Sequence, residues 1–222
     1  MIKAKPLLYF FDMDHTLIDN DCDLSWKVFL NELKIISAAD VDLAMKFFDD
    51  YRLGILDEAE FIKFQFQEFI GQTADEMLNL AESHFENCVK DKFISSSVRE
   101  LCSAQQSGVP VALLTGTNQI VAAPIARHCN IEHVLATGLE SDNEGRFTGR
   151  VTGEYCCGTG KIAYAEDFCR RFGLSLKDVA YYGDSLSDRF LLEKVGFPVA
   201  VNPCERLLEL AVANNWRIMT AR

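Results

Sequence analysis

The chain carries paired aspartates where an apolar segment ends. Asp12 and Asp14 follow the run 7–11, with one residue between them. A continuous apolar run of this length is typical of a strand buried on both faces of a parallel sheet. Side chains at i and i+2 point to the same side of an extended chain. Two carboxylates placed there repel each other unless a divalent cation such as Mg²⁺ binds between them. One aspartate would act as nucleophile and the other as acid and then base, although a pair of loop aspartates would give the same pattern.

A third aspartate has the same sequence context. Asp184 follows the apolar run 179–182 and Gly183. Ligands of open parallel sheets bind outside the carboxyl ends of strands, so we expect Asp184 to meet the amino-terminal pair and complete a metal site. Asp188 has two interpretations. It either supports this site or closes a capping box with Ser185 at a helix start.

Two further segments carry groups that bind phosphate. Thr115 and Gly116 follow the apolar run 109–114, and a helix is expected to begin near Asn118. A hydroxyl and backbone N–H groups at such a junction bind phosphate oxygens, but Thr-Gly-Thr-Asn is also ordinary turn and N-cap chemistry. Lys161 begins a helical pattern after a glycine-rich stretch. If it reaches the acidic edge, it would offset phosphate charge.

These segments alternate with helical patterns along most of the chain. Apolar runs of strand length occur at 7–11, 109–114, 134–136, 179–182 and 197–201. The alternation predicts an α/β fold, a doubly wound (Rossmann-like) parallel sheet with helices on both faces. Residues 142–153 are expected to form a small hairpin or loop.

Residues 17–91 show a different pattern. Three amphipathic stripes predict helices there, and the aromatic stripe of the middle helix is expected to be core. We therefore expect a helical cap at 17–91, inserted after the first strand of an α/β catalytic core formed by 1–16 and 92–222.

The predicted cap carries all of the excess negative charge. The chain has a formal net charge of −11, and residues 17–91 contain 17 acidic and six basic side chains, whereas the remainder has 16 of each. This excess is either a solvated helical surface or a field that favours substrates with a cationic end.

Composition also limits the partners and the compartment. The negative charge and the absence of a basic run disfavour binding to nucleic acid. No segment approaches the roughly 20 apolar residues of a membrane helix, so membrane insertion is not expected. The chain start does not resemble a secretory signal, and the eight cysteines lack C-x-x-C spacing, which together favour reduced thiols in the cytoplasm.

The four motifs together resemble the haloacid dehalogenase-like superfamily of aspartyl phosphatases. They match its D-x-D-x-T, strand-end Thr/Ser, Lys and G-D-x-x-x-D motifs in order, over nearly the whole chain. The helical insertion is similar to the small cap of the subgroup that includes phosphoserine phosphatase. The stretches 51–57, 124–126 and 198–203 look like a bacterial branch of phosphoserine phosphatase-like proteins, some assigned to histidinol phosphate and others to lipid phosphates.

The resemblance implies a role for each motif residue. Asp12 would attack phosphorus, and Asp14 would protonate the leaving alkoxide and then deprotonate the hydrolytic water. An acid at the position of Asp14 favours phosphoryl transfer over dehalogenation. Mg²⁺ would be held by the Asp12 carboxylate, the Asp14 backbone carbonyl and Asp184. The groups that would bind or orient the phosphoryl group are Thr115, Lys161 and Asp188, with Gly116 and Asn118 in support.

Substrate recognition is expected on the cap. The subgroup has a Glu nine residues after the nucleophile and an Arg for the substrate carboxylate. Here Asp21 stands at the first position, with Asp23 nearby, and Arg52 is the one arginine in 17–91, either a carboxylate clamp or a surface residue. The shorter Asp21 favours an amine-bearing substrate such as histidinol phosphate over phosphoserine.

The sequence thus predicts a Mg²⁺-dependent phosphomonoesterase that acts on a small phosphorylated metabolite. Three alternatives stay open: a lipid-phosphate phosphatase, a phosphotransferase or mutase on the same scaffold, and a non-catalytic phosphate- or metal-binding module, such as a receiver-type phosphoacceptor. The sequence does not predict an oligomeric state.

Overall fold

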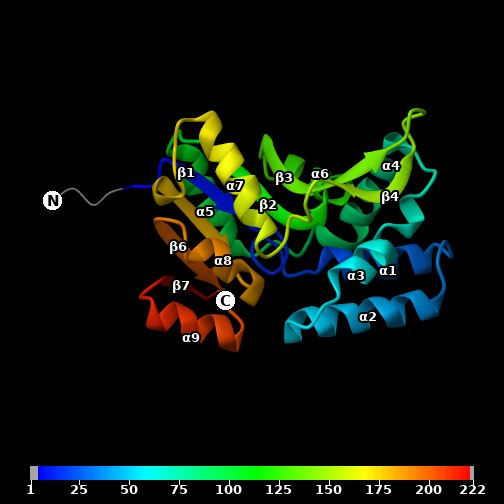
Figure 1. The fold of residues 1–222 in the computed structure, drawn as a ribbon, viewed down its shortest axis with the longest axis horizontal. Coiled ribbons are helices and arrows are strands. Elements are labelled where there is room, and N and C mark those ends of the chain that lie inside the picture. Colours follow the sequence, from blue (N-terminus) through cyan, green and yellow to red (C-terminus); the bar gives the residue numbers. More distant parts are fainter. Residues whose placement is uncertain (1–4, 221–222) are drawn as a thin grey trace.

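A seven-stranded sheet forms the centre of the computed structural model, which describes residues 5–220 (Figure 1). The strands are β1 (Leu8–Phe11), β2 (Val111–Asn118), β3 (His133–Ser141), β4 (Phe147–Thr152), β5 (Val179–Gly183), β6 (Phe197–Val201) and β7 (Arg217–Met219). They lie in the order β4-β3-β2-β1-β5-β6-β7, and all neighbouring pairs are parallel except β3 with β4. The predicted doubly wound α/β sheet is confirmed. The segment 142–153, expected as a small hairpin or loop, holds the turn and β4, and β4 pairs with β3, which extends from the predicted strand at 134–136 to Ser141.

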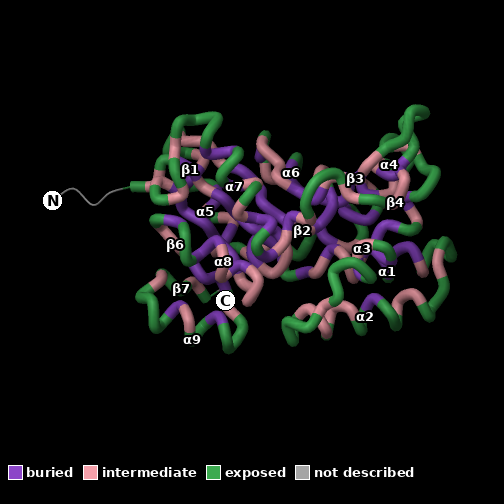
Figure 2. Tube along the Cα trace, viewed as in Figure 1, coloured by how far each residue is buried: buried purple, intermediate pink, exposed green. Residues whose placement is uncertain are grey.

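The central strands are apolar on both faces because helices cover both (Figure 2). Adjacent residues of β1 divide between the faces: Phe10 joins one hydrophobic cluster and Phe11 the other. The cluster of Phe10 includes side chains of α7 (Gly160–Arg171), α8 (Arg189–Leu192) and α9 (Glu205–Ala213). The cluster of Phe11 includes side chains of α5 (Ser95–Gln106) and α6 (Gln119–His128). Burial on both faces explains why these strands lack polar alternation.

A helical insertion lies between β1 and β2. It comprises α1 (Cys22–Glu32), α2 (Ala38–Leu53), α3 (Glu58–Gln65), η1 (Gln67–Phe69), α4 (Ala74–His84) and the π-helical turn η2 (Phe85–Val89). Side chains of Asp21, Ser37 and Thr73 accept hydrogen bonds at the starts of α1, α2 and α4. The sequence analysis missed α2, although Val41, Ala44 and Phe47 recur at helical spacing, because exposed apolar side chains such as Leu43 and Met45 blur the stripe.

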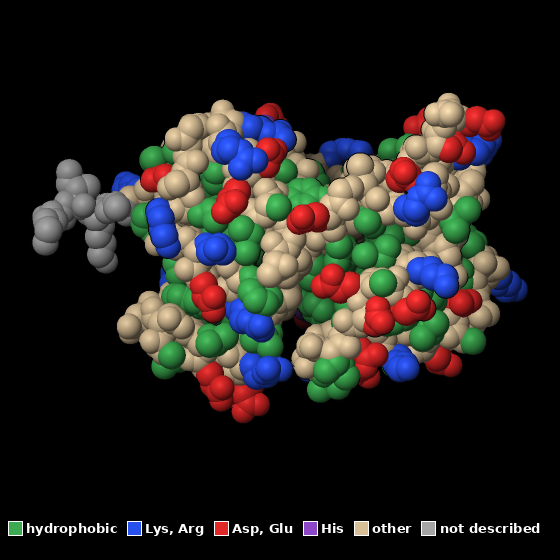
Figure 3. Space-filling view, viewed as in Figure 1, with side chains coloured by type: hydrophobic (Ala, Val, Ile, Leu, Met, Phe, Trp, Pro, Cys, Tyr) green, Lys and Arg blue, Asp and Glu red, His purple; other side chains and the backbone are tan. Residues whose placement is uncertain are grey.

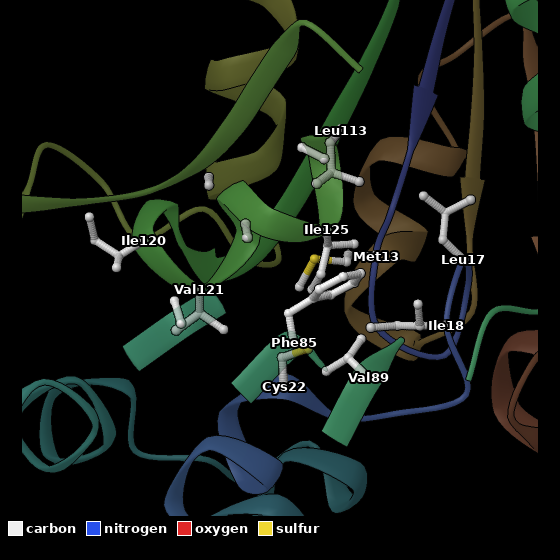
Figure 4. Close-up of a cluster of buried hydrophobic side chains, with 14 of the residues drawn as sticks. Met13, Leu17, Ile18, Cys22, Phe85, Val89, Leu113, Ile120, Val121 and Ile125 are labelled. Atoms are coloured by element: carbon white, nitrogen blue, oxygen red, sulfur yellow. The ribbon is translucent and has the colours of Figure 1, made fainter. Parts of the chain in front are cut away.

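An apolar cluster anchors the loop after β1 to the insertion. Figure 4 shows Met13 and Ile18 of this loop close to Phe85 and Val89 of η2, with Cys22 beside Phe85 and Leu17 farther along the loop. Ile120, Val121 and Ile125 of α6 belong to the same buried cluster. Because Met13 is buried among these residues, the loop that carries its two flanking aspartates is held in place.

The part of the chain that the structure describes contains no helix both long and apolar enough to cross a bilayer.

A buried histidine lies inside the insertion. The ring of His84 packs against Trp26 and Phe29, with centroid distances of 5.5 and 5.6 Å, and its Nε2 lies 2.9 Å from the Ser25 hydroxyl. Burial lowers the pKa of His84 to about 4, and the nearby Lys92 adds to this effect. An unfolded histidine has a pKa of about 6.5, so as the pH falls the unfolded chain takes up a proton before the folded chain does. This residue therefore makes the fold less stable as the pH falls from about 6.5 towards about 4.

We predict that the His84→Gln variant depends less on pH than the wild type does. Between pH 7 and pH 5 the wild type should lose about 2 kcal/mol more of its free energy of unfolding, because only its unfolded state gains the imidazolium charge. Urea denaturation of both proteins at the two pH values measures this difference. Equal losses would show that the ring does not remain neutral in the fold.

Candidate active site

Polar side chains from distant parts of the sequence meet at the carboxyl edge of the sheet. Asp12 directly follows β1, Thr115 lies in β2, and Asp184 directly follows β5. Together with Asp14 and Lys161 they line one pocket. The parallel pairing of β1 with both β2 and β5 brings these strand ends together.

Lys161 is enclosed between two carboxylates at the base of this pocket. Its Nζ lies 2.9 Å from Asp12 Oδ1 and 2.7 Å from Asp188 Oδ1, and Lys161 is only 3% exposed. Burial by itself lowers the pKa of Lys161, but Asp12 and Asp188 together raise it well above its usual range. Burial raises the pKa of Asp12 to about 6, against the opposing effect of Lys161. The lysine is therefore cationic, and Asp12 is ionised at neutral pH.

Asp188 is surrounded by hydrogen-bond donors. Its Oδ1 accepts from Lys161 and from the Tyr181 hydroxyl at 2.5 Å, and its Oδ2 accepts from the backbone N–H groups of Asp184 and Ser185 and from the Ser185 hydroxyl. Burial raises the pKa of Asp188, but Lys161 outweighs it and the pKa ends below its usual value. Both sequence interpretations therefore apply, because the residue closes the capping box and also holds Lys161.

Three carboxylates are close enough to share a cation. Oxygens of Asp12, Asp184 and Asp188 all lie within 4.8 Å of one another. Asp188 is already saturated with donors, whereas Asp184 accepts one side-chain bond, from Thr16 at 3.2 Å. Burial, followed by the charges of Asp188 and Asp12, raises the pKa of Asp184 well above its ordinary value. A bound cation relieves such repulsion, so Asp12 and Asp184 are the side chains that fit a hard divalent metal.

Asp14 is oriented by one donor on each carboxylate oxygen. Oδ1 accepts from the Cys22 backbone N–H at 2.8 Å, and Oδ2 accepts from the Thr117 hydroxyl at 2.7 Å. Burial, followed by the charge of Asp21, raises the pKa of Asp14 to about 7. A carboxyl group that is partly protonated near neutral pH can give a proton in one step and take one in the next.

The segment after Leu114 divides between the pocket and the following helix. Thr115 is buried, and its hydroxyl oxygen accepts from the Thr117 backbone N–H at 3.2 Å. Gly116 also lines the pocket. Asn118 does not line it. Its Oδ1 instead caps α6 by accepting from two backbone N–H groups of the first turn.

The wall formed by the insertion is acidic and aromatic. Asp21 accepts from the backbone N–H of Leu24 at 2.7 Å, and Asp23 accepts from Gln65 Nε2 at 3.1 Å. Burial raises the pKa of Asp21 and raises that of Asp23 strongly. The rings that complete the pocket belong to Phe47, Phe48, Tyr51, Phe61 and Tyr155. Among the described residues that line this pocket, Lys161 is the one lysine or arginine.

Arg52 lies outside this inner pocket. It is exposed, its guanidinium carbon is 5.7 Å from the centroid of the Phe48 ring, and it lines a wider outer groove together with residues of α8 and α9. Figure 3 shows this groove as a notch between α2 and α9, with acidic side chains gathered over α2 and α3. The geometry therefore favours the surface interpretation of Arg52 over the carboxylate clamp.

Three side chains contact the site although the sequence analysis gave them no role. Thr117 holds Asp14, Gln65 holds Asp23, and Tyr51 places its hydroxyl 2.9 Å from Ser185 Oγ. Thr117 could have been found from the sequence, because side chains alternate along a strand and residue 117 therefore lies on the same side as residue 115. The other two lie on helices whose contacts are set only by the tertiary fold.

Comparison with known proteins gives a consistent family. The model of the haloacid dehalogenase-like hydrolases matches residues 9–193. A histidinol-phosphatase from Neisseria meningitidis serogroup C (strain 8013) is 32% identical over 219 residues, 96% of this chain and 97% of the relative. A phosphoserine phosphatase from Mycobacterium tuberculosis (strain ATCC 25618 / H37Rv) is 38% identical over 153 residues, 68% of this chain but 49% of that protein. The chain thus matches about half the length of the mycobacterial relative.

The fold agrees with this family. A solved structure of phosphoserine phosphatase with an analogue of its phospho-aspartyl intermediate superimposes with a TM-score of 0.71, at 18% identity, and covers 99% of this chain and 95% of the other. At that identity the match shows the shared architecture. The family model and the nearly full-length relative go further and confirm the family resemblance. The chain belongs to the haloacid dehalogenase-like hydrolase family.

Proposed function

We propose that this chain is a Mg²⁺-dependent phosphatase that hydrolyses small phosphate monoesters through an aspartyl-phosphate on Asp12. The observation that carries the proposal is the buried ion pair of Asp12 with Lys161, which lies in one pocket with the partly protonated Asp14. The phosphatase names of the two curated relatives support the reaction class.

The residues of the chain divide the reaction between them. An oxygen of Asp12 forms a bond to phosphorus while the bond from phosphorus to the ester oxygen breaks, and Asp14 gives its proton to the leaving alkoxide. Asp14 then takes a proton from the water that attacks the phosphorus of the intermediate. This second displacement releases inorganic phosphate and restores the Asp12 carboxylate. Lys161 remains charged throughout and offsets the negative charge of the phosphoryl group.

The remaining groups hold the phosphoryl group and the metal. The carboxylates of Asp12 and Asp184, with the backbone carbonyl of Asp14, would bind Mg²⁺. When bound, the ion would neutralise phosphoryl charge and make phosphorus more electrophilic. The Thr115 hydroxyl and the Gly116 backbone N–H would bind phosphoryl oxygens.

The helical insertion would act as a cap. Residues 17–91 would cover the catalytic core of 1–16 and 92–222 and keep out water that would bypass the intermediate. A cytoplasmic location fits the eight free cysteines, because thiols stay reduced there.

We further propose that the substrate carries an amine and no carboxylate, as histidinol phosphate does. Burial raises the pKa values of Asp21 and Asp23 on the wall of the insertion, and repulsion from Asp21 raises the pKa of Asp23 further, so a cationic amine is the partner that would favour their ionised forms. Aromatic rings beside them suit a flat heterocycle. The carboxylate of phosphoserine would meet these aspartates, while Arg52 lies in the outer groove. The nearly full-length relative named histidinol-phosphatase supports this choice.

Asp12→Asn should keep the fold but lower turnover by roughly 10³-fold or more, because the amide cannot attack phosphorus. Phosphate release from p-nitrophenyl phosphate with Mg²⁺ measures the effect. Asp75→Asn, an exposed change on α4, is the matched control and should turn over at the wild-type rate. Near-wild-type turnover by the Asp12 variant would remove it from the nucleophile role.

Asp184→Asn should weaken Mg²⁺ binding by at least roughly 10-fold, because it replaces a charged ligand. Calorimetric titration with Mg²⁺ measures affinity directly, and the metal dependence of turnover after chelation measures it independently. The Asp75→Asn control should bind like the wild type. A wild-type affinity in the Asp184 variant would argue against the metal site at this edge.

Among histidinol phosphate, phosphoserine and a lysophosphatidate, the first should have the highest kcat/KM. Asp23→Asn should lower that value roughly 10- to 100-fold, because a charged hydrogen bond to the amine is lost. The same variant should affect p-nitrophenyl phosphate, which has no amine, much less. A clear preference for the lipid, or equal losses with both esters, would contradict the proposed role of the acidic wall.

A further inference from the structure

A tyrosine of the helical insertion contacts the loop after β5. Tyr51 lies near the end of α2, and its hydroxyl is 2.9 Å from Ser185 Oγ and 2.7 Å from Ser187 Oγ. The two serine oxygens are 2.8 Å apart, so the three hydroxyls form one cluster. These contacts connect α2, which forms part of the pocket wall, to the loop that also carries Asp188.

The cluster continues to the proposed nucleophile. Ser185 Oγ is 2.9 Å from Asp188 Oδ2, and Asp188 Oδ1 is 2.7 Å from Lys161 Nζ. That nitrogen lies 2.9 Å from Asp12 Oδ1. An unbroken series of hydrogen bonds therefore leads from the Tyr51 hydroxyl to the carboxylate proposed to attack phosphorus.

The ionised Asp188 sets the direction of the hydrogen bonds that lead to it. The ionised Asp188 accepts only, so Ser185 must donate to it. In the structure the Tyr51 hydroxyl donates to Ser185, and since it has a single proton, Ser187 donates to Tyr51. Loss of the Tyr51 hydroxyl would remove this donor and free the Ser187 proton, so the hydroxyl cluster that holds Ser185 against Asp188 would have to rearrange.

Apart from Tyr51, α2 is held mainly by partly buried aromatic side chains, with the Phe47 ring packed against Phe61 and Phe64 of α3. Ala44 is the one buried residue among its 16, and several of its large apolar side chains, Leu43, Met45 and Leu53, are exposed. Burial of apolar area therefore holds one face of this helix, and the rest of its surface stays in solvent. Phe61 and Phe64 belong to the insertion themselves, whereas the bonds of the Tyr51 hydroxyl connect α2 directly to the α/β part of the chain.

We propose that Tyr51 is a positioning residue that couples the placement of α2 over the pocket to the orientation of Asp188, and through Lys161 to that of Asp12. The proposal rests on the proposed phosphatase function and adds a residue that does not touch the reacting atoms. With α2 in place, Tyr51 completes the donors around Ser185 and the lysine is fully ordered. With α2 displaced, the series is broken at its first bond, so the nucleophile is held in its reactive orientation only beneath a closed insertion.

Kinetics of Tyr51→Phe provide the first test. The variant should lower kcat for p-nitrophenyl phosphate roughly 3- to 10-fold, the equivalent of one neutral hydrogen bond, with a smaller change in KM. Tyr164→Phe is the matched control, because its hydroxyl donates to a backbone carbonyl on the exposed side of α7, and it should keep the wild-type kcat. In a Ser185→Ala background, Tyr51→Phe should have little further effect, because both changes break the same series.

Amide hydrogen exchange provides a test that needs no turnover. The backbone N–H groups of Asp184 and Ser185 donate to Asp188 Oδ2 at 3.2 and 3.0 Å, so their exchange reports how firmly Asp188 is held. Residue-resolved NMR should show faster exchange of both amides in Tyr51→Phe than in the wild type or in Tyr164→Phe.

The outcomes separate this proposal from the proposed function. If the wild type releases no phosphate from any ester, the phosphatase proposal fails, and exchange at the two amides still decides whether Tyr51 holds the loop. Unchanged exchange in folded Tyr51→Phe overturns the coupling. Additive losses of kcat in the double variant also overturn it. If Ser185→Ala does not fold, the exchange measurement on Tyr51→Phe alone remains decisive.

Discussion

The ammonium group of Lys161, enclosed between two carboxylates, is the charge around which the site is built. A lone buried ammonium would cost several kcal/mol, and Asp12 and Asp188 offset this by pairing with it. In the proposed reaction Asp12 changes its charge when it is phosphorylated, so the second carboxylate must hold the lysine at that moment. The five hydrogen bonds to Asp188 suit that demand, since they leave it no freedom to turn.

The pocket has two electrostatically different halves. The α/β part supplies the lysine, a threonine hydroxyl and backbone N–H groups, which suit a phosphate. The insertion supplies Asp21 and Asp23, and no lysine or arginine of the insertion is among the described residues that line the inner pocket. A substrate with an anion at one end and a cation at the other would therefore bind in one orientation, with its phosphate against Asp12.

The sequence predicted the sheet and its aspartates for one physical reason. Strands buried on both faces give unbroken apolar runs, and Asp12 and Asp184 stand where two such runs end. The same reasoning missed α2, because exposed apolar residues such as Leu43 and Met45 mask the stripe that its partly buried side chains form. It could not assign Gln65 or Tyr51, because their partners are more than 40 positions away. Arg52 was singled out for being the one arginine of 17–91, and composition carries no information on where a side chain points.

Ala44 is the one fully buried residue of α2, and such partial burial suits a wall that opens in the proposed reaction. A helix held over the pocket by a large apolar face would hinder the entry of substrate, because each exposed Leu or Met would cost about 1.5–3 kcal/mol. Hydroxyl contacts such as those of Tyr51 with Ser185 and Ser187 can be exchanged for contacts with water at a net cost of about 1 kcal/mol each. Closure through hydroxyl contacts is therefore readily reversible, and it also fixes the serine that orients Asp188. An apolar contact of equal strength would close the pocket, but it would not fix the orientation of Ser185 and so would not influence Lys161.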